Sequence, residues 1–189
     1  MGYLNMTLMT KRELATSLKK LMQKKPLEKI RVKDVVADCG VNRQTFYYHF
    51  KDIYDLLDWI YKTEAVDRIA GYKTYDTWKQ GYYMIFKYVA DNHAFCMNTF
   101  YSLGRDHLDK FLYNITFHLL IGVIDEISVE LNIKKEQKNF VAEVYTFILI
   151  GLVVKWMKNG MKENPEDIIE KLNKLIEGEI KNGLQKYIQ

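Results

Sequence analysis

Apolar residues recur every three or four positions along most of this chain, which is the spacing of amphipathic α-helices. Thr10 and Glu13 form a capping-box pattern that predicts the start of a first helix, and Pro26 lies beyond its end. The apolar face of this helix is formed by Leu14, Leu18, Leu21 and Met22. Because no segment alternates between polar and apolar residues as a strand does, the pattern predicts an all-α fold.

About nine helices are predicted in total. Turn-forming residues separate them, notably Gly71, Gly160 and Pro165. The predicted helices after the first one are residues 31–39, 43–50, 52–69, 76–91, 93–103, 106–131, 134–159 and 165–189. A chain of 189 residues can bury a substantial core in one or two domains.

A tight turn joins the second and third predicted helices. Gly40 permits the chain reversal because glycine adopts a positive φ without steric cost, and Asn42 is a good N-cap for the helix that follows. In the third helix only Phe46 and Phe50 are clear core anchors. The buried side of the second helix is predicted to be Val32, Val35, Val36 and Cys39. This pattern is typical of a helix-turn-helix, whose second helix enters the major groove of DNA.

The outward side chains of residues 43–49 suit nucleic-acid binding. Arginine pairs with guanine, glutamine pairs with adenine and tyrosine packs on a thymine methyl, so base contacts are expected from Arg43, Gln44 and Tyr47. Phosphate contacts are expected from Lys33, Thr45, Tyr48, His49 and Lys51, and Asn42 completes the predicted DNA-binding set. The alternative is a surface helix whose tyrosines and histidine pack against a neighbouring element.

Charge is concentrated at one end of the chain. Residues 1–51 contain eleven Lys or Arg and four Asp or Glu, which gives +7, whereas the remaining residues sum to −3. A basic N-terminal quarter on a mildly acidic body is the expected footprint of a terminal DNA-binding domain.

The run Val-Asn-Arg-Gln-Thr-Phe-Tyr-Tyr-His-Phe-Lys at residues 41–51 resembles the recognition helix of TetR-family transcription regulators. Residues 32–40 resemble the second helix of that family, and the likeness extends over residues 10–61. The resemblance implies a helix-turn-helix DNA-binding domain of residues 1–51, a helical regulatory and dimerisation domain of residues 52–189, and a homodimer on a DNA operator. Ile53 departs from the family, which often has a phosphate-binding lysine there.

A second resemblance concerns residues 52–59, Asp-Ile-Tyr-Asp-Leu-Leu-Asp-Trp, and the tyrosine-rich segment after them. They are similar to the TetR subgroup that regulates bacterial dihydroxyacetone-kinase operons. This implies activation of those genes, with sensing delegated to a kinase-like partner protein that binds dihydroxyacetone.

The alternative regulator is a repressor released by a small aromatic or apolar ligand that binds its C-terminal domain directly. Candidate ligand-binding residues are Tyr82, Phe86, Tyr101, Phe117, His118 and Tyr145. Aromatic residues at helical spacing fit a packed core equally well, and His118 also fits a core histidine.

The last two predicted helices each carry a long apolar seam, which one subunit's core does not fully cover. A symmetric pair of subunits would bury both seams in a four-helix interface. The expected interface residues are Phe147, Gly151, Trp156, Leu172, Ile176 and Ile180. The other interpretation places both seams inside one subunit.

Other functions find little support. Cys39 and Cys96 fit no metal motif, and no phosphate loop or nucleophile–histidine pattern indicates an enzyme or a cofactor. No signal peptide is evident, and the apolar run at residues 144–154 is shorter than the roughly 20 residues of a membrane span. We therefore expect a cytoplasmic protein without membrane contact. A helical interaction protein that has lost DNA binding is a further alternative, which residues 43–51 argue against.

Overall fold

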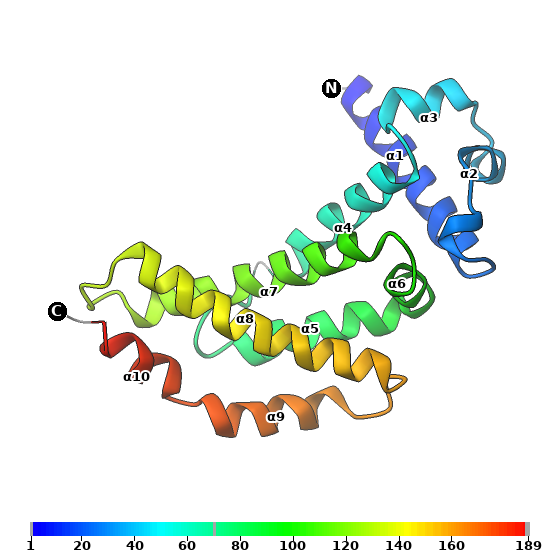
Figure 1. Ribbon diagram of the computed structural model, residues 1–189. Helices are drawn as coiled ribbons and strands as arrows, with labels where there is room; N and C mark the ends of the chain where they lie inside the picture. Colours follow the sequence, from blue (N-terminus) through cyan, green and yellow to red (C-terminus); the bar gives the residue numbers. More distant parts are fainter. Residues whose placement is uncertain (1, 70, 188–189) are drawn as a thin grey trace. The chain divides into compact units, whose positions relative to one another are not determined.

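The computed structural model describes residues 2–69 and 71–187 (Figure 1). These residues form ten α-helices, a short 3-10 helix and no strand, which confirms the all-α prediction. The elements in chain order are α1 (Gly2–Met22), η1 (Leu27–Lys29), α2 (Val32–Cys39), α3 (Arg43–His49), α4 (Ile53–Ile69), α5 (Trp78–Asp91), α6 (His93–Phe100), α7 (Arg105–Ile127), α8 (Lys135–Lys158), α9 (Pro165–Ile176) and α10 (Glu179–Gln185).

Two predictions of helix extent differ most from the structure. α1 begins at Gly2, well before Thr10, whose hydroxyl donates to the Met6 carbonyl inside the helix instead of capping its start. The single helix predicted over residues 165–189 is interrupted, because Gly178 adopts φ 78° in the left-handed region between α9 and α10. This break accounts for the tenth helix.

The chain forms two compact units. The N-terminal unit comprises Met1–Glu64 and Asn92–Lys110, and the C-terminal unit comprises Ala65–Asp91 and Phe111–Gln189. α6 and the start of α7 thus belong to the same unit as α1 to α4, although they lie far from those helices in the sequence. A functional division into residues 1–51 and 52–189 stays a prediction.

The core of the N-terminal unit is formed by one apolar face of each of its helices. Tyr61 of α4 and Phe95 of α6 pack with ring centroids 4.9 Å apart. Fully buried side chains come from α1 to α4 and include Leu14, Leu18, Val35, Phe46, Leu56, Leu57 and Ile60. These helices therefore hold one another through burial of their apolar faces, as their periodicity predicts.

The core of the C-terminal unit is built around α5. The Tyr82 hydroxyl donates a 2.7 Å hydrogen bond to the Leu149 carbonyl of α8, and the Phe86 ring lies 5.0 Å from that of Trp156. α7 contributes buried side chains that include Leu112, Leu119, Leu120 and Ile124. α9 packs against α5, and α10 packs against α8 and α9.

Among the described residues, α8 alone is long and apolar enough to cross a membrane by length and composition. Core helices of globular proteins pass the same test. Val141, Ala142, Leu149 and Val153 of this helix are buried in the C-terminal unit.

Candidate nucleic-acid interface

α2 and α3 are fixed to α1 by buried side chains. Val35 and Phe46 are fully buried, and Phe50 follows α3 into the same core. The buried Ser17 hydroxyl of α1 donates a 3.0 Å hydrogen bond to the Val35 carbonyl. Gly40 has φ 72° and turns the chain from α2 into α3. The predicted helix-turn-helix is present.

Asn42 caps α3 as predicted. Its side-chain oxygen accepts hydrogen bonds from the Thr45 backbone N–H at 2.8 Å and from the Thr45 hydroxyl at 3.1 Å. Such a cap satisfies an N–H that has no partner within the helix. Because this oxygen serves the cap, a DNA contact by Asn42 would come from its amide nitrogen.

The other predicted DNA-binding residues of α3 lie at its surface. Tyr47 and Tyr48 are 58% and 71% exposed, which is a large exposed fraction for tyrosine. Arg43 and Gln44 are exposed, while Thr45 and His49 are half-buried. A helix of seven residues therefore presents a guanidinium group, an amide and two phenols to solvent.

Basic groups near α3 are available for phosphates. Both acidic residues of α2 pair with lysines: Asp38 with Lys20 of α1 at 2.6 Å, and Asp34 with Lys25 of the turn after α1 at 2.9 Å. The Lys25 ammonium, followed by the Arg31 backbone N–H, lowers the pKa of Asp34. In contrast, three basic residues in or beside α2 and α3 are in none of the ion pairs of the described residues: Lys33, Arg43 and Lys51.

His49 lies in the last turn of α3 beside a cation. Desolvation first, and then the charge of Lys11, lowers the pKa of His49 below its ordinary value. The Lys11 ammonium lies 5.4 Å from the Phe50 ring centroid and 5.9 Å from that of Trp59. In the unbound chain both effects disfavour the protonated imidazole.

The predicted ligand-binding residues are dispersed. In the C-terminal unit Tyr82 and Phe86 are fully buried, and His118 is exposed with its Nδ1 2.7 Å from the Asn114 carbonyl. Tyr101 belongs to the N-terminal unit and is 72% exposed. The remaining two residues, Phe117 and Tyr145, are half-buried beside the apolar cluster around Ile124. Their role in ligand binding stays a prediction.

A cavity of about 320 Å³ in the C-terminal unit was not foreseen from the sequence. Trp78 and Leu120 contribute to its apolar lining, and Asn173, Glu177 and Lys181 contribute polar groups at the α9–α10 junction. None of the predicted ligand-binding residues lines it. The break at Gly178 that shapes this junction is not revealed by apolar periodicity.

The predicted dimer residues fall into two groups. Phe147 is 59% exposed and Gly151 is exposed, both on α8. The others are buried or half-buried within their own subunit: Trp156, Leu172, Ile176 and Ile180. These four side chains pack at least partly within the chain, and their part in a subunit interface stays a prediction.

The exposed apolar residues of α8 form one stripe. We call Phe140, Val144, Phe147, Ile148 and Gly151 the α8 stripe; its four large side chains are 42–59% exposed. Their spacing of three or four residues places them on one side of the helix. Apolar residues clustered in this way on a surface are typical of protein–protein contacts.

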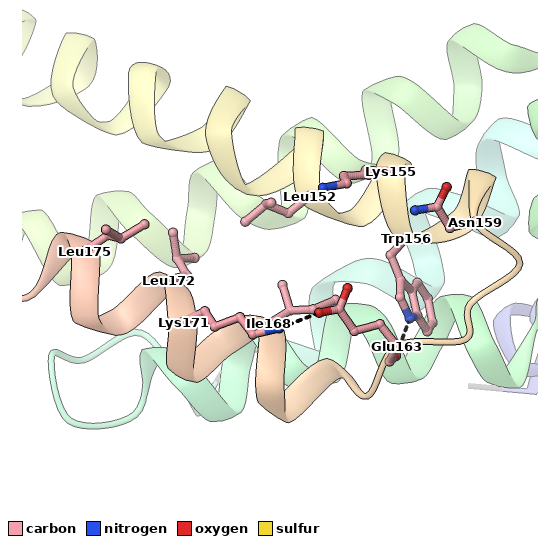
Figure 2. Close-up of a pocket in the computed structure, with 9 residues that line it drawn as sticks. All are labelled: Leu152, Lys155, Trp156, Asn159, Glu163, Ile168, Lys171, Leu172 and Leu175. Carbon is pink, nitrogen blue, oxygen red and sulfur yellow. Dashed lines mark hydrogen bonds and ion pairs between the residues drawn. The ribbon is translucent and has the colours of Figure 1, made fainter.

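A groove of about 270 Å³ lies between α8 and α9 (Figure 2). At one end the indole nitrogen of Trp156 donates to the Glu163 carbonyl at 2.8 Å, and the Glu163 carboxylate pairs with Lys171 at 2.8 Å. Toward the other end lie Leu172 and Leu175, and Leu175 is 75% exposed. An apolar lining thus continues from α8 onto α9.

Among the described residues, no group of three His, Cys, Asp or Glu side chains could hold a metal ion. Cys96 is fully buried, and desolvation raises its pKa to about 12, so its thiolate is not formed at neutral pH.

Two family descriptions match the chain. Residues 16–60 match the bacterial regulatory proteins of the tetR family, and residues 76–178 match a transcriptional regulator C-terminal region. A relative from Lactococcus lactis subsp. lactis (strain IL1403), the HTH-type dhaKLM operon transcriptional activator DhaS, is 29% identical over 100 residues. That match covers 52% of this chain and about half, 54%, of the relative.

Solved structures share the whole fold. The dihydroxyacetone kinase operon activator DhaS superposes with a TM-score of 0.71 at 19% identity, covering 96% of this chain and 99% of that one. The fatty acid degradation regulator FadR from Bacillus halodurans gives 0.63 at 17% identity, covering 88% and 94%. With a surface-exposed recognition helix and matches to both its DNA-binding and its C-terminal regions, this chain belongs to the TetR family of transcriptional regulators.

Proposed function

We propose that this regulator binds a double-stranded DNA operator as a homodimer, with α3 of each subunit in the major groove. Arg43, Gln44 and Tyr47 contact base edges, while the other predicted residues hold phosphates. The phosphate-binding residues in this proposal are Lys33, Thr45, Tyr48, His49 and Lys51, and Asn42 orders the first turn. Two recognition helices would read half-sites about 34–36 Å apart.

One observation carries this proposal. α3 buries Phe46 and is followed by the buried Phe50, yet exposes Arg43, Gln44 and both tyrosines between these anchors. An exposed tyrosine ring places apolar surface in water and adds nothing to the core. The exposure of both rings therefore supports a contact with a partner molecule. The free basic groups nearby indicate that this partner is polyanionic.

Fluorescence anisotropy on specific and scrambled duplexes across a salt series tests the division of roles. Arg43→Ala should reduce the preference for the specific duplex, by about 1–3 kcal/mol. Lys51→Ala should weaken binding to both duplexes and lower the salt slope by about one. Equal losses of specificity from both substitutions would contradict the assignment.

We further propose that the chain activates genes for dihydroxyacetone utilisation, working with a kinase-like partner protein that senses dihydroxyacetone. The names of the similar DhaS proteins support this reading. Tyr82 and Phe86 are buried, and the Tyr82 hydroxyl donates to the Leu149 carbonyl, so neither side chain is free to bind a ligand. This supports the proposal that a partner protein binds the dihydroxyacetone. A cytoplasmic location fits such a regulator.

Affinity capture of the partner with and without dihydroxyacetone, followed by calorimetry on the isolated regulator, tests this proposal. Ligand-dependent capture of a kinase-like protein is the expected result. Tight direct binding of a small molecule by the regulator alone would favour the alternative, a repressor released by its own ligand.

The α8 stripe supports the homodimer. Gly151 lies within the stripe, and a Cβ added there would have no neighbour within 4 Å in its own subunit. A helix of a second subunit could therefore approach α8 closely at this point. The groove between α8 and α9 would receive side chains of that subunit.

A further inference from the structure

One side chain of α6 fastens the connection that leads from α1 into α2. The Asn98 side-chain oxygen accepts the Leu27 backbone N–H at 2.8 Å. Its amide nitrogen donates to the Met22 carbonyl at 2.9 Å and to the Lys25 carbonyl at 2.8 Å. All of these residues lie in the N-terminal unit, although more than seventy positions separate Asn98 from its partners.

These bonds satisfy backbone groups that local structure leaves open. Met22 ends α1, so its carbonyl lacks a partner within the helix. η1 begins after Pro26 and has no side-chain cap of its own. An asparagine amide carries two N–H donors and an acceptor, and here all three functions are used. Asn98 thus defines both the end of α1 and the start of η1.

The turn after α6 contacts the same connection. The Glu28 carboxylate accepts the Leu103 backbone N–H at 3.1 Å. Gly104 lies so close to η1 that an added Cβ would be 3.0 Å from the Leu27 Cδ2 atom and 3.0 Å from that of Leu57. The connection is therefore packed as well as hydrogen-bonded against α6 and the turn after it.

We propose that Asn98 is a positioning residue for DNA binding: it fixes the α1–α2 connection and, through α2, the orientation of α3. The inference rests on the proposed DNA-binding function and adds to it a determinant outside the helix-turn-helix. α2 follows η1 almost directly, since only Ile30 and Arg31 separate them. A displaced η1 therefore moves the start of α2 and, with it, the tight turn into α3.

Asn98→Asp is the most direct test, because it keeps the size and the acceptor but replaces both donors with an oxygen that faces two carbonyls. Hydrogen exchange of the amides of residues 27–31 should become faster by at least about tenfold, because two part-buried hydrogen bonds are lost. Affinity for the operator duplex, measured well below the thermal midpoint, should fall by about tenfold. Asn114→Asp makes the same chemical change at an exposed site of α7 and should alter neither quantity.

Gly104→Ala provides a second variant in which Asn98 is retained. The added methyl group presses on Leu27, so exchange and operator affinity should change in the same direction by a smaller factor. A merely structural role would lower the thermal midpoint of Asn98→Asp without changing the operator affinity of the folded protein, and that result would overturn the proposal. Unchanged exchange at residues 27–31 would also overturn it. A wild-type chain that binds no duplex would instead refute the proposed function itself.

Discussion

At the scale of the residue, single hydrogen bonds between residues far apart in the sequence hold the helices of the N-terminal unit together. Ser17 lies on the apolar side of α1 but carries a hydroxyl, which is buried and donates to the Val35 carbonyl of α2. Buried polar groups are tolerated only with a partner. Sequence reasoning overlooked Ser17, because a serine at one core position looks no different from a serine at the surface.

Ser17→Ala should lower the free energy of unfolding by about 1 kcal/mol, since the Val35 carbonyl loses a buried donor. Thr16→Ala is the matched control, because the Thr16 hydroxyl is exposed and bonds only within its own helix. Urea denaturation of both variants measures the difference. Equal midpoints for the two variants would show that the bond between α1 and α2 adds nothing.

Stability should decrease as the pH falls below neutrality, in part because of His49. Its pKa is lowered in the folded chain, so the unfolded chain takes up a proton first as the pH falls through about 6.5. The loss of stability levels off once the pH is below the pKa of His49 in the folded chain. His49→Gln should flatten this dependence in urea titrations between pH 7.5 and pH 5, and an unchanged slope would contradict the role of His49.

At the scale of the element, α3 is too short to be stable without its cap and its two anchors. Isolated helices of seven residues do not form in water, so α3 depends on Asn42, Phe46 and the packing of Phe50. Both anchors and the cap were predictable, because a capping side chain and a spacing of four residues are local signals. The same reasoning failed for α10, whose start depends on Gly178 within an otherwise continuous apolar pattern.

Asn42→Ala should lower the free energy of unfolding by about 1 kcal/mol and weaken operator binding as well, because the first turn of α3 frays. Asn42→Ser keeps a capping oxygen and should restore most of both quantities. Urea denaturation and anisotropy on the same preparations give the comparison. An alanine variant as stable as the serine variant would mean that the bond to Thr45 does not stabilise α3.

At the scale of the whole molecule, the C-terminal unit buries one apolar seam and leaves another exposed. The α9–α10 seam packs on its own subunit through Leu172 and Ile180, whereas the α8 stripe, with Phe147 at 59% exposure, remains at the surface. Burial of apolar area contributes roughly 25 cal/mol per Å², so we expect a second subunit to contact this stripe.

If the α8 stripe forms the proposed homodimer contact, Phe147→Glu should yield a monomer, because a carboxylate would be buried there without a partner. Sedimentation velocity measures the change, and operator affinity should fall with it since only one half-site is held at a time. Lys162→Glu alters charge at an exposed position outside the α8 stripe and should leave the dimer intact. A Phe147→Glu dimer of wild-type stability would place the interface elsewhere.

Local signals in the sequence were sufficient for most of the helices, the turn at Gly40, the cap at Asn42 and the outward face of α3, because each depends on residues a few positions apart. The tertiary structure decided what depends on distant residues. It assigned α6 to the N-terminal unit through Asn98, and it divided the apolar residues of α8 and α9 between core and surface. Periodicity shows that a helix has an apolar side, but only the packed neighbours determine which part of that side remains exposed to solvent.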